Sequence, residues 1–219
     1  AVVPIVAATA LAGFQRSDGS WTILILALAS AILIQVGTNL VNDAVDFKKG
    51  ADTSDRIGPQ RVTQSGLFTS SQVMKAAGFI FFIALLCGIP LVIKGGLPII
   101  FIGLISILMG YSYTSGPFPL AYLGLGDLFV VFFFGLVAVS GMYYLHTGLV
   151  NLDCAVLGLQ IGLLSTVLIA INNLRDCEGD QKVGKRTLAV RFGKKFVRWE
   201  ILFLLILPFF AGSYWYLAR

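Results

Sequence analysis

The sequence predicts an all-α protein, a polytopic bundle of transmembrane helices, and two observations support this fold class. First, 57% of the 219 residues are hydrophobic and only 12% are charged, whereas a soluble domain usually has about 25% charged residues. Second, the apolar residues form long blocks, and a helix that crosses the hydrocarbon core needs roughly 20 of them. The mean hydropathy of +0.87 agrees with this composition. Too little polar surface remains to cover a water-soluble protein.

Seven apolar blocks predict seven helices. The first block, residues 2–14, is short and has no basic segment before it, so a helix is a better interpretation than a signal peptide. The chain does not begin with Met, and its last block runs into the C-terminus. We therefore expect one domain over residues 1–219 that is truncated at both ends. The remaining blocks are residues 21–40, 73–93, 97–111, 128–145, 152–174 and 201–217.

The net charge is +5, and most of the basic residues are concentrated in two loops. Five of the 16 Lys and Arg lie between residues 42 and 75, and eight more lie between residues 175 and 198. Four predicted helices separate these loops, so both loops lie on one face of the membrane. Basic loops are typical of the cytoplasmic face, and no nucleic-acid partner is needed to explain the charge. The three cysteines show no metal-binding spacing.

The second predicted helix ends in a polar stripe. Asn39, Asn42, Asp43 and Asp46 are spaced at i, i+3, i+4 and i+7, which places them on one face of an α-helix. Carboxylates at a membrane boundary are costly unless they are paired, hydrated or bound to a metal. The stripe therefore marks a candidate binding site.

The sixth predicted helix ends in a similar stripe. There Asn172 or Asn173 is followed by Asp176 and Asp180, again at spacings of three and four residues. A basic loop follows each stripe, which suggests an internal structural repeat. Solvated helix ends with ordinary acid–base pairs are the simpler alternative.

Oxygen ligands without nearby His or Cys favour Mg²⁺ over a transition metal. Adjacent basic residues would bind the remaining charge of a phosphate-bearing substrate. The candidate metal ligands are Asn42, Asp43, Asp46, Asp176 and Asp180. The candidate diphosphate-binding residues are Arg56, Arg61, Lys182, Lys185 and Arg186.

The two stripes also resemble a known family. The segments NLVNDAVDFKKGADTSDRIGP and NNLRDCEGDQKVGKRTLAVRFG resemble the two Asp-rich motifs of the UbiA superfamily of intramembrane prenyltransferases. The segment YTSGPFPLAYLGLGDLFVVFFFG resembles the branch that prenylates 1,4-dihydroxy-2-naphthoate in menaquinone synthesis. The similarity extends over residues 3–216. Members have nine helices, which implies that about two are missing here at the C-terminal end.

The resemblance implies roles for individual residues. Asn42, Asp43 and Asp46 match the first metal-binding motif, with Asp52 as a further member. The second motif is matched by Asp176 and Asp180, and the diphosphate would contact Arg61, Lys185 and Arg186. One departure concerns a Lys that some relatives have after the fourth helix, because this chain has no Lys or Arg between Gly96 and Arg175.

The function implied is the transfer of a polyprenyl chain from its diphosphate to dihydroxynaphthoate, with Mg²⁺ as cofactor and with loss of CO₂. Asp46 and Asp176 are the expected catalytic residues. Asp127 is a candidate for orienting the aromatic acceptor, although an Asp at a helix start is often an N-cap. The expected location is the plasma membrane of a bacterium, with the active site facing the cytoplasm.

Two alternatives remain open. A related prenyltransferase could use another aromatic acceptor, such as 4-hydroxybenzoate or homogentisate, because the two stripes recognise the diphosphate and not the ring. From a different class, a carrier could use the carboxylates to bind ions, since repeated motifs at helix ends also occur in transporters.

Overall fold

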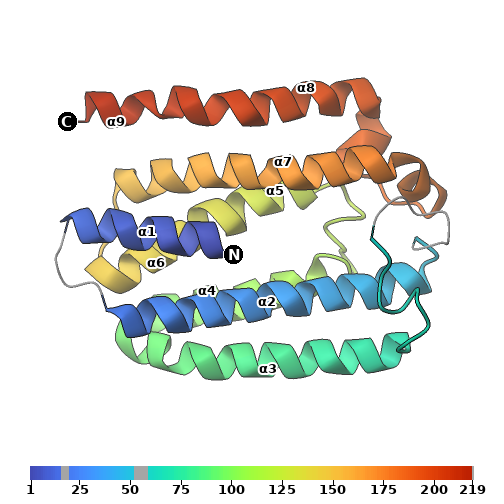
Figure 1. The fold of residues 1–219 in the computed structure, drawn as a ribbon, viewed down its shortest axis with the longest axis horizontal. Helices are drawn as coiled ribbons and strands as arrows, with labels where there is room; N and C mark the ends of the chain where they lie inside the picture. The colour runs from blue at the N-terminus through green and yellow to red at the C-terminus, as the bar shows by residue number, and fades with distance from the viewer. Residues whose placement is uncertain (16–19, 52–58, 219) are drawn as a thin grey trace.

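The computed structural model describes residues 1–15, 20–51 and 59–218, and its regular elements in these ranges are all helical (Figure 1). The segment α5–η1–α6 is one continuous rod, in which η1 is π-helical, and α8 leads directly into the short α9. The described part of the chain thus forms seven rods, as predicted. In chain order the elements are α1 (Val2–Gln15), α2 (Trp21–Lys48), α3 (Ser70–Gly95), α4 (Leu97–Ser112), α5 (Gly126–Val130), η1 (Val131–Val137), α6 (Ala138–Thr147), α7 (Leu152–Lys182), α8 (Leu188–Ala211) and α9 (Ser213–Leu217).

Within the described residues, five of these rods are long and apolar enough to cross a membrane. They are α2, α3, the rod that ends with α6, α7, and the rod formed by α8 and α9. The apolar parts of α1 and α4 are shorter. These lengths and compositions identify an integral membrane protein.

Two helices extend beyond their apolar blocks. The predicted blocks end at residues 40 and 174, but α2 continues to Lys48 and α7 to Lys182. The additional turns carry the Asn and Asp residues of the two stripes. The helical spacing assumed for the stripes is therefore confirmed.

One predicted helix begins much earlier than its apolar block indicates. The helix α8 starts at Leu188, where the Thr187 hydroxyl caps it by accepting a hydrogen bond from the Val190 amide at 3.4 Å. Its first turn ends at Gly193, whose φ of 85° breaks the helix. The prediction began at residue 201 because the preceding turns are rich in Lys and Arg and do not form an apolar run.

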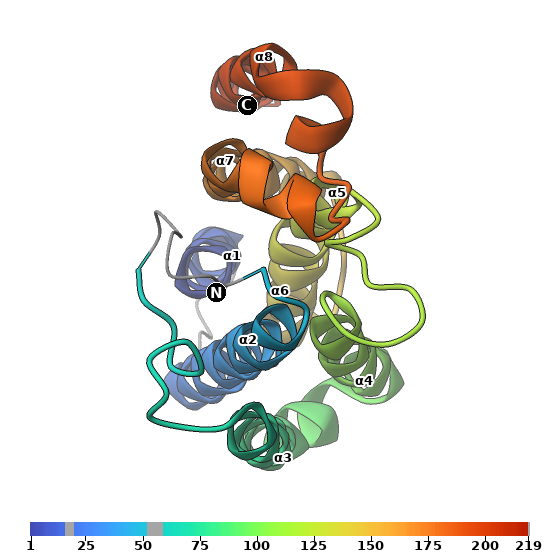
Figure 2. The same ribbon diagram turned by 90° about the vertical axis from the view of Figure 1, so that its right-hand side faces the viewer.

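The helices run roughly parallel to one long axis, and their ends gather at two faces (Figure 1). The outermost helix α8 packs on α7, and α3 packs on α2 at the opposite side of the bundle (Figure 2). The C-terminal ends of α2 and α7 and the connection between α4 and α5 lie at the same end, on the right in Figure 1. The described parts of the two basic loops therefore lie on one side, as the sequence predicted.

Glycines allow η1 and α7 to pack at backbone distance. A Cβ atom added at Gly135 would lie 2.3 Å from the carbonyl oxygen of Gly158, and one added at Gly162 would lie 2.6 Å from the carbonyl oxygen of Val131. Small residues at helix contacts are typical of membrane bundles. This packing fixes the rod that carries Asp127 against the helix that carries the second stripe.

Candidate active site

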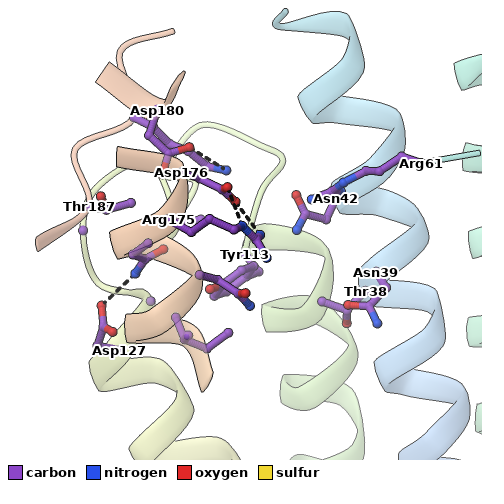
Figure 3. A pocket seen from close by; sticks show the side chains of 17 residues that line it. Thr38, Asn39, Asn42, Arg61, Tyr113, Asp127, Arg175, Asp176, Asp180 and Thr187 are labelled. Atoms are coloured by element: carbon purple, nitrogen blue, oxygen red, sulfur yellow. Dashed lines mark hydrogen bonds and ion pairs between the residues drawn. The ribbon is translucent and has the colours of Figure 1, made fainter. Parts of the chain in front are cut away.

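A polar cavity of about 240 Å³ lies between the C-terminal halves of α2 and α7. The connection between α4 and α5 supplies another wall. Side chains of the two helices face each other across this space (Figure 3). The residues that line it are Thr38, Asn39, Asn42, Arg61, Tyr113, Ala121, Gly124, Gly126, Asp127, Ile169, Asn172, Asn173, Arg175, Asp176, Asp180, Lys185 and Thr187.

Of the four residues of the first stripe, two line the cavity and two lie beside it. Asn39 and Asn42 line the cavity, and the buried Oδ1 atom of Asn42 has no hydrogen-bond partner within the described ranges. Asp43 instead accepts hydrogen bonds from the Val62 amide at 3.1 Å and from the Thr63 amide and hydroxyl. Asp43 therefore fastens the segment after residue 60 to α2.

Asp46 is a buried anion with several cationic and polar partners. It is only 1% exposed. Its carboxylate accepts a hydrogen bond from the Tyr122 hydroxyl at 2.9 Å and another from the Lys185 ammonium at 3.1 Å. The guanidinium of Arg61 lies 3.6 Å away. A buried carboxylate needs such compensation, because removing a charge from water costs several kcal/mol (roughly) when it is unpaired.

The residues of the second stripe lie on the cavity wall, together with Arg175, which the sequence did not indicate as a site residue. Both oxygens of Asp176 accept hydrogen bonds of 2.7 Å from the Arg175 guanidinium. The Asp180 carboxylate lies 3.7 Å from the Lys185 ammonium. The sequence gives no separate signal for Arg175, because this residue stands inside the Asp-rich motif and not in the basic loop that follows it.

Asp127 lies deeper in the cavity, near the start of α5. One carboxylate oxygen accepts a long hydrogen bond from the Asn173 side chain at 3.4 Å. The other oxygen is buried and has no partner among the described atoms. The N-cap position of α5 is occupied by Leu125, and no side chain caps this helix. The structure therefore does not support the capping interpretation of Asp127.

Tyr113 lines the polar cavity, and its ring also contacts an aromatic side chain of α5, which in turn contacts one of η1. Burial raises the pKa of its hydroxyl, and the charges of Asp127, Asp46 and Asp180 raise this pKa further, so the hydroxyl stays protonated. The Tyr113 ring lies 5.4 Å from that of Phe129, which stacks on Phe133 at 4.5 Å.

This aromatic series leads toward a second, apolar cavity. Phe133 lines a cleft of about 400 Å³ whose walls come mainly from α2, α3, α4 and α6. Aliphatic side chains such as Ile34, Leu91 and Met142 dominate its surface. The cleft would accommodate a hydrocarbon chain.

The predicted diphosphate-binding residues do not all reach the cavity. Arg61 and Lys185 line it. Lys182 and Arg186 are exposed and are absent from its lining. Arg56, like Asp52, lies outside the described residues.

A comparison with known families decides the classification. The model of the UbiA prenyltransferase family matches residues 1–219. The chain belongs to the UbiA prenyltransferase family. The resemblance seen in the Asp-rich motifs is thus confirmed.

Individual relatives agree with this assignment. The chain is 36% identical over 200 residues to 1,4-dihydroxy-2-naphthoate octaprenyltransferase of Haemophilus influenzae, covering 88% of this chain and 65% of that protein. It is 37% identical over 193 residues to the protein of that name from Mycobacterium tuberculosis, with 88% and 65% coverage. It is 30% identical over 200 residues to human UbiA prenyltransferase domain-containing protein 1, with 87% and 56% coverage. The chain thus spans 65% of the length of the two bacterial relatives and 56% of the length of the human one.

Proposed function

We propose that this chain carries the active site of a prenyltransferase that transfers a polyprenyl group from its diphosphate to 1,4-dihydroxy-2-naphthoate, with loss of CO₂, in menaquinone biosynthesis. The naphthoate acceptor is favoured by the names of the bacterial relatives. The observation that carries the proposal is the convergence of both stripes on one cavity. Side chains from Asn39 and Asn42 on α2 and from Asp176 and Asp180 on α7 line the same space.

The donors of this cavity fit Mg²⁺. They are amide and carboxylate oxygens, which this ion prefers, and the buried Oδ1 of Asn42 lacks another partner in the described part of the chain. In the same part, no three His, Cys, Asp or Glu side chains stand close enough to hold a metal on their own. Substrate phosphate oxygens and water usually complete the coordination of Mg²⁺. We therefore expect the ion to bind together with the diphosphate. Asn42, Asp176 and Asp180, which line the cavity, would hold it together with Asp46, which lies next to the cavity against Arg61 and Lys185.

The basic side chains would bind and orient the diphosphate. Lys185 and Arg61 line the cavity and contribute positive charge next to the Asp46 carboxylate. Lys185 also lies next to the Asp180 carboxylate. The planar guanidinium of Arg175 donates two parallel hydrogen bonds to the Asp176 carboxylate. It could bind two oxygens of a phosphate group in the same way. When bound, Mg²⁺ supplies charge that stabilises the leaving diphosphate. Breaking the allylic C–O bond leaves the positive charge on the prenyl carbon.

The aromatic residues next to the cavity would stabilise this positive charge. The rings of Tyr113, Phe129 and Phe133 contact one another in series, from Tyr113 at the polar cavity to Phe133 at the apolar cleft. Aromatic faces attract cations, and they exclude water that would quench the reactive carbon. The prenyl tail would lie in the apolar cleft, while the partnerless oxygen of Asp127 would accept a hydrogen bond from a hydroxyl of the acceptor ring.

The membrane orientation follows from the charged loops. They follow the C-terminal ends of α2 and α7, which lie at the same end of the bundle (Figure 1), and side chains of these two helices line the polar cavity. Since basic loops remain on the cytoplasmic side, the cavity would open toward the cytoplasm, in the plasma membrane of a bacterium.

The central test uses purified protein, a polyprenyl diphosphate and a panel of aromatic acceptors. We expect prenylated product and CO₂ from dihydroxynaphthoate, loss of turnover with EDTA, and recovery with Mg²⁺. If 4-hydroxybenzoate or homogentisate gave product and the naphthoate did not, the assignment of dihydroxynaphthoate as the acceptor would be wrong. If turnover continued in the presence of EDTA, the proposed dependence on Mg²⁺ would be wrong. Ion flux through proteoliposomes without any prenyl transfer would favour a carrier.

A further inference from the structure

The connection between α4 and α5 contains a tyrosine that contacts both halves of the site. Tyr122 is 8% exposed. Its hydroxyl donates a hydrogen bond of 2.9 Å to Oδ1 of Asp46, on α2. Lys185, from the loop after α7, contacts the other oxygen of the same carboxylate at 3.1 Å. Asp46 is therefore held from two sides by residues that are distant in sequence.

The ring of Tyr122 also lies between two ammonium groups. The Nζ atom of Lys49 lies 3.6 Å from the ring centroid, and that of Lys185 lies 5.2 Å from it. A cation within about 6 Å of an aromatic centroid is attracted to the ring. Tyr122 thus contacts Asp46 through its hydroxyl and two lysines through its ring.

The backbone around Tyr122 is fixed to the second half of the site. The Arg186 amide donates a hydrogen bond of 3.0 Å to the Tyr122 carbonyl oxygen. The Arg191 guanidinium donates one of 2.7 Å to the carbonyl oxygen of Leu123. At Gly124, with φ of +72°, an added Cβ would lie 2.3 Å from the Arg186 carbonyl oxygen. The segment is therefore fastened to the loop that carries Lys185 and to the start of α8 by two hydrogen bonds and one close backbone contact.

We propose that Tyr122 is a positioning residue that holds Asp46 of the first motif in register with the second motif. This inference rests on the proposed function. The hydroxyl fixes the rotation of the Asp46 carboxylate, and the backbone bonds fix the hydroxyl relative to the loop after α7. Without the hydroxyl, Asp46 can rotate fully onto Lys185 or Arg61, and its Oδ1 atom loses the bond described here. The site would then bind a metal and a diphosphate less tightly while keeping its charge.

The test is a binding measurement on Tyr122→Phe, because this change removes the hydroxyl and keeps the ring beneath Lys49. The detergent-purified protein is titrated with Mg²⁺ in the presence of inorganic pyrophosphate, and the increase in Tm is recorded. We expect the Mg²⁺ concentration for half-maximal stabilisation to rise about 10- to 100-fold, as is typical when a partner of a metal ligand is lost. In the enzymatic assay the KM for the prenyl diphosphate rises, and the KM for the acceptor stays the same.

Tyr143→Phe is the matched control. Tyr143 is also buried, and its hydroxyl accepts a hydrogen bond of 3.0 Å from Asn151 at the opposite end of the bundle. This variant should lose a similar amount of intrinsic stability but keep the wild-type Mg²⁺ titration. Lys49→Met provides a second variant, in which the hydroxyl remains and the titration shifts less than in Tyr122→Phe.

The outcomes separate this inference from the proposed function. If wild-type protein is stabilised by Mg²⁺ and pyrophosphate and Tyr122→Phe responds identically, the role of Tyr122 is wrong and the proposed function stands. A titration that shifts equally in Tyr143→Phe would also refute it, because the effect would then be general loss of stability. If the wild-type protein shows no response, both the inference and the proposed metal–diphosphate site fail.

Discussion

The ammonium group of Lys185 lies 3.1 Å from an oxygen of Asp46 and 3.7 Å from an oxygen of Asp180. One lysine thus bridges carboxylates of the two motifs, and 139 residues separate it from Asp46. Its charge keeps two anions close together that would otherwise repel each other. Under the proposed function, a diphosphate that enters the cavity with its metal would compete for the same ammonium group, and Lys185 would then pass from protein carboxylates to substrate oxygens.

The first prediction concerns the two lysines of the loop after α7. Lys185→Gln should reduce diphosphate release by about 100-fold or more, the order seen when one preorganised donor to a developing negative charge is removed. Lys182→Gln is the control, because Lys182 is exposed and does not line the cavity. Pyrophosphate release from a radiolabelled or fluorescent substrate provides the measurement. Equal losses in both variants would show that only the total charge of the loop matters.

The second prediction concerns the pair between Arg175 and Asp176. Arg175→Lys keeps the charge but cannot form two parallel hydrogen bonds to a carboxylate or phosphate. We expect kcat/KM for the prenyl diphosphate to fall about 10-fold or more, since each 1.4 kcal/mol (about one lost charged hydrogen bond) changes a rate tenfold.

An exposed ion pair on the neighbouring turn supplies the control for this change. Lys194 and Glu178 are 2.6 Å apart, with side chains that are 48% and 81% exposed. Lys194→Gln should leave both activity and Tm unchanged, because water and salt screen exposed pairs. An active Arg175→Lys enzyme with wild-type kinetics would show that Arg175 contributes only charge.

The sequence predicted most of the fold and indicated the candidate site for clear physical reasons. Apolar blocks report membrane helices because the bilayer sets their length. The spacing of Asn39, Asn42 and Asp46 reports a helix face because the helical period is fixed. These signals are local, so they could be read without knowing the tertiary structure.

What the sequence could not predict depends on contacts between distant segments. Asp43 and Asn42 are neighbours, but Asp43 is engaged by Val62 and Thr63 while Asn42 faces the cavity. No pattern around Tyr122 reports that its hydroxyl meets a carboxylate on α2. The early start of α8 was missed because a helix rich in Lys and Arg does not give an apolar run.

The third prediction concerns the packing of η1 on α7. Gly135→Ala places a methyl group where its Cβ would lie 2.3 Å from the Gly158 carbonyl oxygen. The two backbones must move apart, and overpacking of this kind costs about 1–3 kcal/mol. We expect a lower Tm in detergent. Gly78→Ala is the control, because a Cβ at that position meets no atom within 4 Å. If the Gly135→Ala and Gly78→Ala proteins were equally stable, η1 and α7 could move apart at this contact without a measurable cost in stability.

The fourth prediction separates acceptor binding from diphosphate binding. Asp127→Asn replaces the carboxylate whose Oδ1 atom is buried without a partner in the described structure, while an amide oxygen can still accept the hydrogen bond from Asn173. We expect the KM for dihydroxynaphthoate to rise about 10-fold, because a hydrogen bond to a charged group is worth roughly 1.5–3 kcal/mol. The stabilisation by Mg²⁺ and pyrophosphate should stay at the wild-type level.

The control for Asp127 is a carboxylate at the opposite end of the bundle. Asp153 accepts a hydrogen bond of 2.6 Å from the Tyr214 hydroxyl, and Asp153→Asn should leave the KM of both substrates unchanged. If Asp127→Asn instead weakened the response to Mg²⁺ and pyrophosphate and left the acceptor KM intact, Asp127 would belong to the metal–diphosphate site. The acceptor would then have to be oriented by other groups on the cavity wall, of which Asn172 and Thr38 line the same space.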